Sequence, residues 1–205
     1  MSNNPIIVFE GIETSGKSTC LKKAIKYLKK NKIKHISFRE PGGTNLSEKL
    51  RQLMLNKKSK LNNKTDLFLL MASRSENFDK ILKENYKKKV ILIDRFIDST
   101  IAYQHYGMGI NKKLIINLNK TILNNIKPSF TFLNIVNTKN LKYRLKSRSN
   151  KNRYDNFNIK FYKKVQKGYI KLSKNKKNYM IVNSNNAIGD NKKIIIKKIN
   201  SILSI

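Results

Sequence analysis

The chain has 205 residues and one cysteine, and its 45 Lys+Arg against 12 Asp+Glu give a formal net charge of +33. This length indicates one domain, residues 1–205, with a full core, and a lone cysteine excludes an intramolecular disulfide framework. We expect a cytoplasmic protein without a membrane partner, because no apolar run reaches the ~18 residues of a span. The excess charge is mostly lysine and is not interleaved with aromatic residues, so it predicts a solvated surface and no specific nucleic-acid partner.

The first predicted strand, residues 6–9, leads into a glycine-rich segment and then into apolar residues at helical spacing over 19–30. The segment fits GxxxxGK[ST], in which backbone N–H groups surround phosphate oxygens at a helix N-terminus. In this pattern Lys17 adds a charge for the β- and γ-phosphates, and Ser18 is placed to bind Mg²⁺. The residues predicted to bind ATP are Gly11, Ile12, Glu13, Thr14, Ser15, Gly16, Lys17, Ser18 and Thr19.

A second predicted strand, residues 33–38, ends in the polar loop REPGGT, 39–44. This is the edge at which open α/β sheets bind ligands. The helical pattern of 46–55 carries Arg51, and that of 65–86 carries Arg74. From local pattern alone we expect Arg74 to be a surface arginine whose stem lies along apolar neighbours.

The third predicted strand, residues 90–93, runs into Asp94 and Arg95. An acid after a buried strand beside a P-loop is typical of a Walker B-type group that accepts water or Mg²⁺. It also suits a helix N-cap, and the two roles are compatible. The next segment, 96–109, holds polar groups suited to a base and a sugar: Asp98, Ser99, Thr100, Tyr103 and Gln104.

Beyond this segment the pattern predicts a helix over 111–125, a strand over 130–135 and a helix over 138–146. Residues 147–156 are basic with almost no apolar side chain, so we expect an exposed, mobile segment. Such a segment is usually a solvated loop, but in a phosphoryl-transfer enzyme it has the composition of a lid. A helix over 157–172, a strand over 179–182 and a helix over 188–203 complete an α/β fold: a P-loop three-layer αβα domain with a mostly parallel five-stranded sheet.

The positions of the arginines indicate the chemical class of the acceptor substrate. Arg39, Arg51, Arg74 and Arg95 lie on or after predicted sheet edges, and no His or Glu is evidently placed to deprotonate a hydroxyl group. An acceptor that is already a phosphate needs only cations that hold two anions in line. This favours a nucleoside monophosphate kinase over a nucleoside kinase or a GTPase. A deoxynucleoside kinase, or a basic P-loop protein that binds nucleic acid without catalysis, remains the alternative.

Four sequence stretches carry a family resemblance: FEGIETSGKST at 9–19, FREPGGT at 38–44, ASR at 72–74 and DRFIDSTIAYQ at 94–104. With these motifs the chain resembles bacterial thymidylate kinases along nearly its whole length. The resemblance implies transfer of the ATP γ-phosphoryl group to dTMP with Mg²⁺, giving dTDP and ADP, and a homodimer.

The resemblance also implies residue roles. Glu13 would lie near the sugar 3′-hydroxyl, Arg95 would touch the acceptor phosphate, and Tyr103 would close off the 2′ position. The implied dTMP-binding residues are Glu40, Pro41, Arg51, Leu70, Arg74, Arg95, Thr100, Tyr103 and Gln104. Ser18 and Asp94 would hold the metal, and the implied catalytic residues are Lys17, Arg95, Glu13, Arg148 and Arg153.

Two positions depart from the family pattern. Leu70 stands where the family commonly has a phenylalanine that stacks on thymine. The lid reads Asn152, Arg153, Tyr154, Asp155 in place of Asp-Arg-aromatic-Glu. Because the P-loop has no arginine of its own, Arg148 or Arg153 must supply the lid charge.

Overall fold

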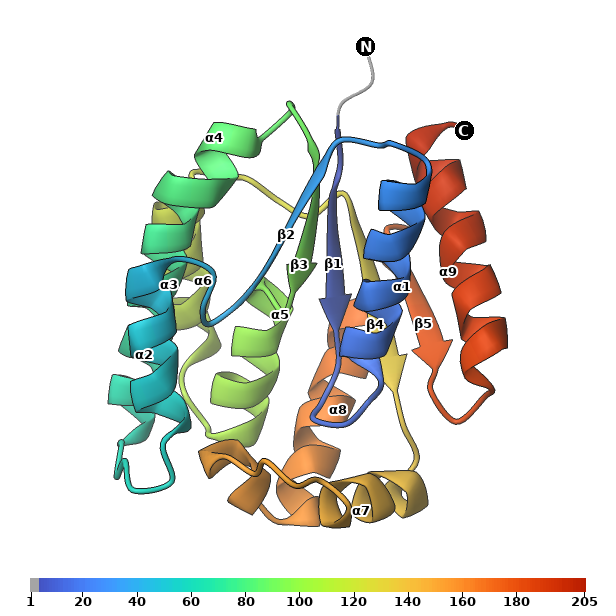
Figure 1. Cartoon of the computed structure of the whole chain (residues 1–205). Coiled ribbons are helices and arrows are strands. Elements are labelled where there is room, and N and C mark those ends of the chain that lie inside the picture. The colour runs from blue at the N-terminus through green and yellow to red at the C-terminus, as the bar shows by residue number, and fades with distance from the viewer. Residues whose placement is uncertain (1–3) are drawn as a thin grey trace.

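Five apolar segments form one fully parallel sheet with the strand order β2-β3-β1-β4-β5 (Figure 1). The computed structural model describes residues 4–205. The strands are β1 (Ile6–Glu10), β2 (His35–Arg39), β3 (Val90–Asp94), β4 (Phe130–Ile135) and β5 (Tyr179–Asn183). Each strand lies within about two residues of its predicted position, and the predicted α/β class and parallel sheet are confirmed.

The helices cover both faces of this sheet, as the alternating side chains of β1 require. Ile7 and Phe9 pack with α1 and α9, while Ile6 and Val8 pack in a second cluster on the opposite face. The helices are α1 (Lys17–Lys30), α2 (Asn45–Leu55), α3 (Asn63–Asn77), α4 (Lys83–Asn85), α5 (Ile97–Thr100), α6 (Lys112–Leu123), α7 (Thr138–Lys146), α8 (Ile159–Ser173) and α9 (Ile188–Leu203).

Two wide π-helical turns and one 3₁₀ turn interrupt the predicted pattern. The π-helical turn Phe78–Leu82 joins α3 to α4 with right-handed helical backbone at both junctions, so the helix predicted over 65–86 is present and contains a π-helical turn. The turn Ile101–Gly107 continues α5, and Arg153–Asn156 forms a 3₁₀ turn within the predicted lid. The helix predicted from 157 begins at Ile159, because the Asn158 side chain accepts from the Phe161 N–H and caps it.

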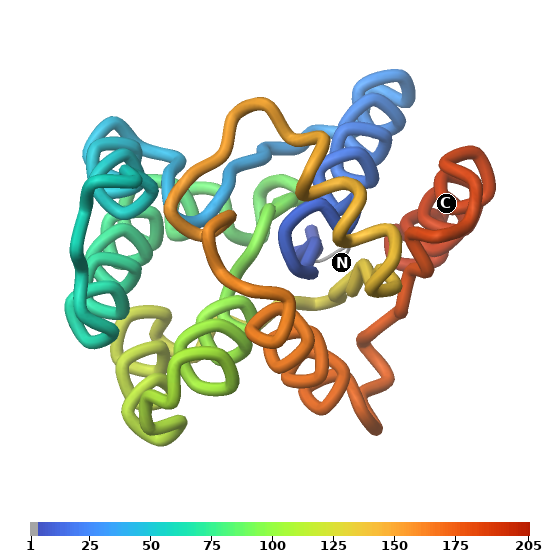
Figure 2. Tube along the Cα trace, turned by 90° about the horizontal axis from the view of Figure 1, so that it is seen from below, coloured from blue at the N-terminus to red at the C-terminus, as the bar shows by residue number. Residues whose placement is uncertain are grey.

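The carboxyl ends of all five strands point to one edge of the sheet, where the loops that follow β1, β2 and β3 meet (Figure 1). Seen from that edge, the segment between α7 and α8 crosses the mouth of the structure towards α2 (Figure 2). This edge therefore gathers the segments that sequence analysis singled out. Among residues 4–205, none of the helices has the length and apolar character that crossing a bilayer requires.

Candidate active site

A cavity of about 640 Å³ opens at this edge of the sheet. Its wall is built by the P-loop, the loop after β2, α2, α3, the end of β3, α5 with its π-turn, and the segment that includes α7. The predicted site residues on its wall are Ile12, Glu13, Thr14, Ser15, Gly16, Lys17, Ser18, Thr19, Glu40, Pro41, Arg51, Leu70, Arg74, Asp94, Arg95, Thr100, Tyr103, Gln104 and Arg148. Two predicted residues, Gly11 and Arg153, are not part of this wall.

The P-loop connects β1 to α1 with a backbone that only glycine adopts freely. Gly11 has φ 143°, and a Cβ there would lie 2.4 Å from the Asn134 carbonyl oxygen. Gly16 has φ 82° and precedes α1 without a side-chain cap on the helix. The first N–H groups of α1 therefore stay available for an anion at the helix N-terminus.

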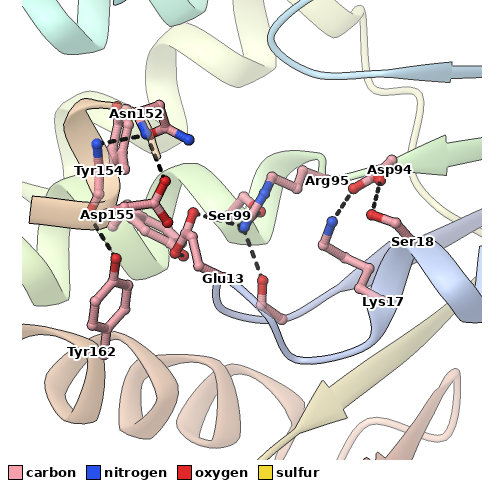
Figure 3. A network of polar contacts seen from close by, with 12 residues as sticks. Glu13, Lys17, Ser18, Asp94, Arg95, Ser99, Asn152, Tyr154, Asp155 and Tyr162 are labelled. Carbon is pink, nitrogen blue, oxygen red and sulfur yellow. Dashed lines mark hydrogen bonds and ion pairs between the residues drawn. The ribbon is translucent and has the colours of Figure 1, made fainter. Parts of the chain in front are cut away.

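Lys17 and Ser18 both contact Asp94, which ends β3 (Figure 3). The Lys17 ammonium forms an ion pair with Asp94 Oδ1, and Ser18 Oγ donates to Asp94 Oδ2 at 3.1 Å. Burial, reinforced by Arg95, lowers the pKa of Lys17. Burial of Asp94 acts to raise the pKa of its carboxyl, but Lys17 and Arg95 outweigh it and hold this pKa below its usual value.

The Ser18 hydroxyl and the Asp94 carboxylate are the hard oxygen donors that Mg²⁺ prefers, and they lie side by side. Nowhere in residues 4–205 do three or more His, Cys, Asp or Glu side chains form a metal cage. The donor set therefore suits Mg²⁺, which commonly keeps waters and binds one or two protein groups together with substrate phosphates.

Arg95, which follows β3, reaches back to the P-loop (Figure 3). Its Nη2 donates to Glu13 Oε1 at 3.0 Å and its Nη1 to the Gly11 carbonyl oxygen at 2.9 Å. The Tyr103 hydroxyl donates to the other Glu13 oxygen, and the guanidinium lies 5.1 Å from the Tyr103 ring centroid. Arg95 has φ 68°, an uncommon conformation for a residue with a side chain, held in part by its N–H on the Phe9 carbonyl.

Arg74 is buried, so the expectation of a surface arginine is wrong. The residue is 1% exposed, and its Nε forms an ion pair with Glu40 Oε2 at 2.7 Å. Its Nη1 donates to Asn119, and its guanidinium lies over the Phe96 ring. Burial raises the pKa of Glu40 against the opposing effect of Arg74.

Arg51 supports the loop after β2 from α2. Its Nη1 donates to the Pro41 carbonyl oxygen at 2.9 Å, and burial, followed by the charge of Arg39, lowers its pKa to about 10. Arg51 therefore stays charged at neutral pH. With Arg74 and Arg95 it places three guanidinium groups on the cavity wall, which suits a phosphate group.

Leu70 and Gln104 also line the cavity wall. Leu70 is 9% exposed and also packs in the cluster around Met54 and Leu67. The neighbouring Phe68 is 52% exposed and outside the cavity wall, so it does not replace a stacking ring there.

Asp98 does not belong to this cavity, although the sequence placed it among the base- and sugar-binding groups. On α5 its neighbours Ser99 and Thr100 line the cavity, while Asp98 lines a separate hollow beside Lys112 and Lys176. The turn of a helix by about 100° per residue accounts for the difference. Burial, with the charge of Glu10, raises the pKa of Asp98 to about 7.

The predicted lid arginines point to different places. Arg148 lines the cavity and pairs with Asp155 at 2.7 Å, whereas Arg153 pairs with Asp66 and donates to the Met54 carbonyl oxygen. Tyr154 is 8% exposed, so the expectation of a wholly exposed segment is wrong at this residue. A capping box between Asn152 and Asp155 orders the turn (Figure 3).

The sequence patterns missed Arg144, which lies on the cavity wall, and Glu10, which does not line the cavity but bonds to Ser99 in its wall. Arg144 on α7 donates to the Thr14 carbonyl oxygen at 3.1 Å and to the Ser184 carbonyl oxygen at 2.8 Å, which joins the P-loop to the end of β5. Glu10 is buried and accepts from Phe96 N at 2.9 Å and from Ser99 Oγ at 2.5 Å. An acid at the end of a buried strand was a visible signal for Glu10, but Arg144 lies in a helix rich in basic residues and gave none.

Comparisons with known proteins show the family of the chain. The family model described as thymidylate kinase matches residues 9–195. The thymidylate kinase of Thermosipho africanus is 38% identical over 89% of this chain and 90% of its own length, and that of Ehrlichia canis is 39% identical over 90% of each. The solved structure of thymidylate kinase from Ehrlichia chaffeensis matches with a TM-score of 0.76 and 32% identity, over 96% of this chain and 98% of that one. The chain therefore belongs to the thymidylate kinase family.

Proposed function

We propose that the chain transfers the γ-phosphoryl group of ATP to dTMP in the cavity at the carboxyl edge of the sheet. As a thymidylate kinase, it produces dTDP from dTMP. The observation that carries the site assignment is one cavity whose wall contains both the P-loop and three arginines, Arg51, Arg74 and Arg95. Such a wall suits two phosphate-bearing substrates that meet in the same cavity.

In this proposal the P-loop amides and Lys17 hold the ATP phosphates, and Arg95 holds the acceptor phosphate. Ser18 and Asp94 would hold Mg²⁺, which would neutralise further phosphate charge when bound. Arg148 lines the cavity from the lid side and offers a cation to the charge that develops on the transferring group. The acceptor oxygen belongs to a phosphate that is ionised at neutral pH, so the reaction needs no general base.

The cations on the cavity wall support a monophosphate acceptor over a nucleoside, since Arg51, Arg74 and Arg95 suit an acceptor phosphate. Glu13 accepts hydrogen bonds from Arg95 and from Tyr103. These bonds hold the carboxylate between the Arg95 guanidinium and the Tyr103 hydroxyl. We assign Glu13 and Tyr103 to the sugar, and Leu70, Arg74, Thr100 and Gln104 to the base.

The test is ADP release by the purified chain with ATP and a panel of acceptors: dTMP, dUMP, dCMP, dGMP and thymidine. We expect the highest kcat/KM with dTMP and no appreciable turnover of thymidine. Turnover of thymidine above that of dTMP would replace the proposal with a deoxynucleoside kinase. No turnover of any acceptor, with DNA binding that weakens steeply as salt is added, would favour the nucleic-acid alternative.

We also propose a homodimer and a cytoplasmic location. Leu46 and Leu53 on α2 and Phe68 on the adjacent α3 are large apolar side chains about half exposed, which favours an interface on this flank. Sedimentation of the wild type and of Leu53→Glu tests this, since a dimer through this flank should dissociate in the variant. Cys20, buried and unpaired, fits a reducing compartment.

A further inference from the structure

Asp66 on α3 is a buried carboxylate that accepts hydrogen bonds from three separate side chains. It is 1% exposed and does not line the cavity. Gln104 Nε2 donates to its Oδ2 at 2.9 Å, and the Tyr154 hydroxyl donates to the same oxygen at 2.7 Å. The Arg153 guanidinium pairs with Oδ1. One acid thus joins the wall of the cavity to the 3₁₀ turn of the predicted lid.

The contact with Asp66 fixes which way the Gln104 amide faces. A carboxylate only accepts hydrogen bonds, so the amide must turn its NH₂ group towards Asp66. The carbonyl oxygen, Oε1, is left on the other side, and this buried atom has no hydrogen-bond partner within residues 4–205. Since Gln104 lines the cavity, the unpaired acceptor indicates that a bound ligand donates a hydrogen bond there.

The pyrimidine bases differ in what they offer to such an acceptor. Thymine and uracil carry an N3–H donor, whereas cytosine has a bare N3 acceptor in the same position. An acceptor opposite N3 therefore favours thymine and uracil, while an NH₂ group in its place would favour cytosine. Sites that leave a polar group unpaired against the wrong substrate discriminate strongly.

We propose that Asp66 is a positioning residue that holds the Gln104 carbonyl oxygen towards N3 of the acceptor base, and so sets selectivity for thymine-type bases. The same carboxylate connects Gln104 to the 3₁₀ turn of the lid, because it also contacts Arg153 and Tyr154. The inference rests on the proposed function, because it assigns the base to the part of the cavity that Gln104 lines. It extends that function to a residue that does not touch the substrate.

The decisive variant is Asp66→Asn, which keeps the shape but lets the Gln104 amide rotate, because the new amide at position 66 offers both a donor and an acceptor. We expect the ratio of kcat/KM for dTMP to that for dCMP to fall at least about tenfold, mainly through a higher KM for dTMP. The KM for dUMP should rise in parallel, since uracil shares N3–H. Asp79→Asn, a carboxylate close by in the chain that does not line the cavity, is the control of equal charge change and should keep the wild-type ratio.

A double variant exchanges the carboxylate and the amide between positions 66 and 104. When Asp66→Asn is combined with Gln104→Glu, the introduced NH₂ group faces one oxygen of the introduced carboxylate and leaves the other oxygen towards the cavity. We expect this double variant to recover most of the dTMP to dCMP ratio. It tests the inference independently of whether the single variant folds.

Tyr154→Phe separates orientation of the amide from attachment of the lid. It removes one lid contact but leaves the Gln104 contact with Asp66, so the dTMP to dCMP ratio should stay unchanged. Trypsin cleavage after Arg148, Lys151 or Arg153 reports the link to the lid. Bound dTMP should slow this cleavage in the wild type and protect less in Asp66→Asn.

Three results would overturn the inference: an unchanged base ratio in Asp66→Asn, an equal loss with dTMP and dCMP, or a double variant that stays unselective. An equal loss would mean that Asp66 only stabilises the fold. Failure of the proposed function is distinguishable, because a wild-type chain that does not prefer dTMP fails before any variant is made.

Discussion

Lys17 and Asp94 form an ion pair although 77 residues separate them in the sequence. The pair joins the start of α1 to the end of β3, so the loops after two neighbouring strands are held together at the centre of the site. Ser18 donates to the same carboxylate. One acid thus positions both side chains that the P-loop offers to phosphate and metal.

Lys17→Ala should lower kcat roughly a thousandfold, because it removes a charge that acts on the transferring phosphate in a site with little water. It should also lower the melting temperature, since Asp94 loses its ion-pair partner in a largely buried position. Steady-state ADP release and thermal unfolding of the same preparation measure the two effects. Combining Lys17→Ala with Asp94→Asn should recover stability but not activity, and a single variant that keeps more than a tenth of the wild-type kcat would contradict the assignment.

Alanine substitutions of the two lid arginines should change different kinetic parameters. Arg148 lines the cavity, so Arg148→Ala should lower kcat by about a hundredfold or more through loss of transition-state charge. Arg153 pairs with Asp66 away from the cavity, so Arg153→Ala should act mainly on stability of the lid turn and on KM for dTMP. Single-turnover rates at saturating substrates measure the difference, and a larger kcat loss for Arg153→Ala would mean that this side chain leaves Asp66 during catalysis.

Leu70→Phe tests the missing aromatic ring. Leu70 lines the cavity, so a phenylalanine can gain a stacking contact of about 0.5–1.5 kcal/mol with the base. We expect KM for dTMP to fall by up to roughly tenfold with kcat nearly unchanged, because stacking acts equally on the ground and transition states. An unchanged KM with a lower melting temperature would show instead that the ring overpacks the cluster around Met54 and Leu67.

Asp98 should make stability depend on pH. Its pKa of about 7 lies above the usual 3.8, so between these values the folded chain keeps a proton that the unfolded chain has lost. Stability from this group therefore falls as pH rises towards 7 and stays reduced above it. Asp98→Asn should raise the melting temperature at pH 8.5, by about 2–4 °C for each kcal/mol gained, and raise it much less at pH 5. An equal gain at both pH values would exclude this carboxyl as the cause, and Asp79→Asn is the matched control.

Short motifs predicted the parts of the site in which residues adjacent in the sequence bind the same group. The P-loop pattern located Gly11 to Ser18 because one backbone turn brings its N–H groups together. The strand that runs into Asp94 located the acid beside it, since buried strands have a clear apolar signal. Both predictions depend on local sequence, and the structure places Lys17, Ser18 and Asp94 in contact.

Residues that act through distant partners could not be predicted in this way. Arg74 has the sequence context of a surface arginine, and only the fold brings Glu40 to it from the loop after β2. Asp66 lies among polar and apolar helix residues, and its partners come from 38 and 88 residues away. Asp98 was misplaced because its side of α5 depends on how that helix sits on the sheet, which periodicity over four residues does not define.

The strand order places the residues proposed for the donor and for the acceptor nucleotide on different loops. The loops after β2 and β3 carry residues proposed for the acceptor, while Arg144 and Ser184, which follow β4 and β5, adjoin the P-loop on the other side of β1. The proposed donor and acceptor sites therefore meet between β1 and β3, where Asp94 contacts Lys17 and Arg95 contacts Glu13. Substitutions in the loop after β2 can alter the choice of acceptor with little effect on the donor, whereas substitutions at Glu13, Asp94 or Arg95 would affect both.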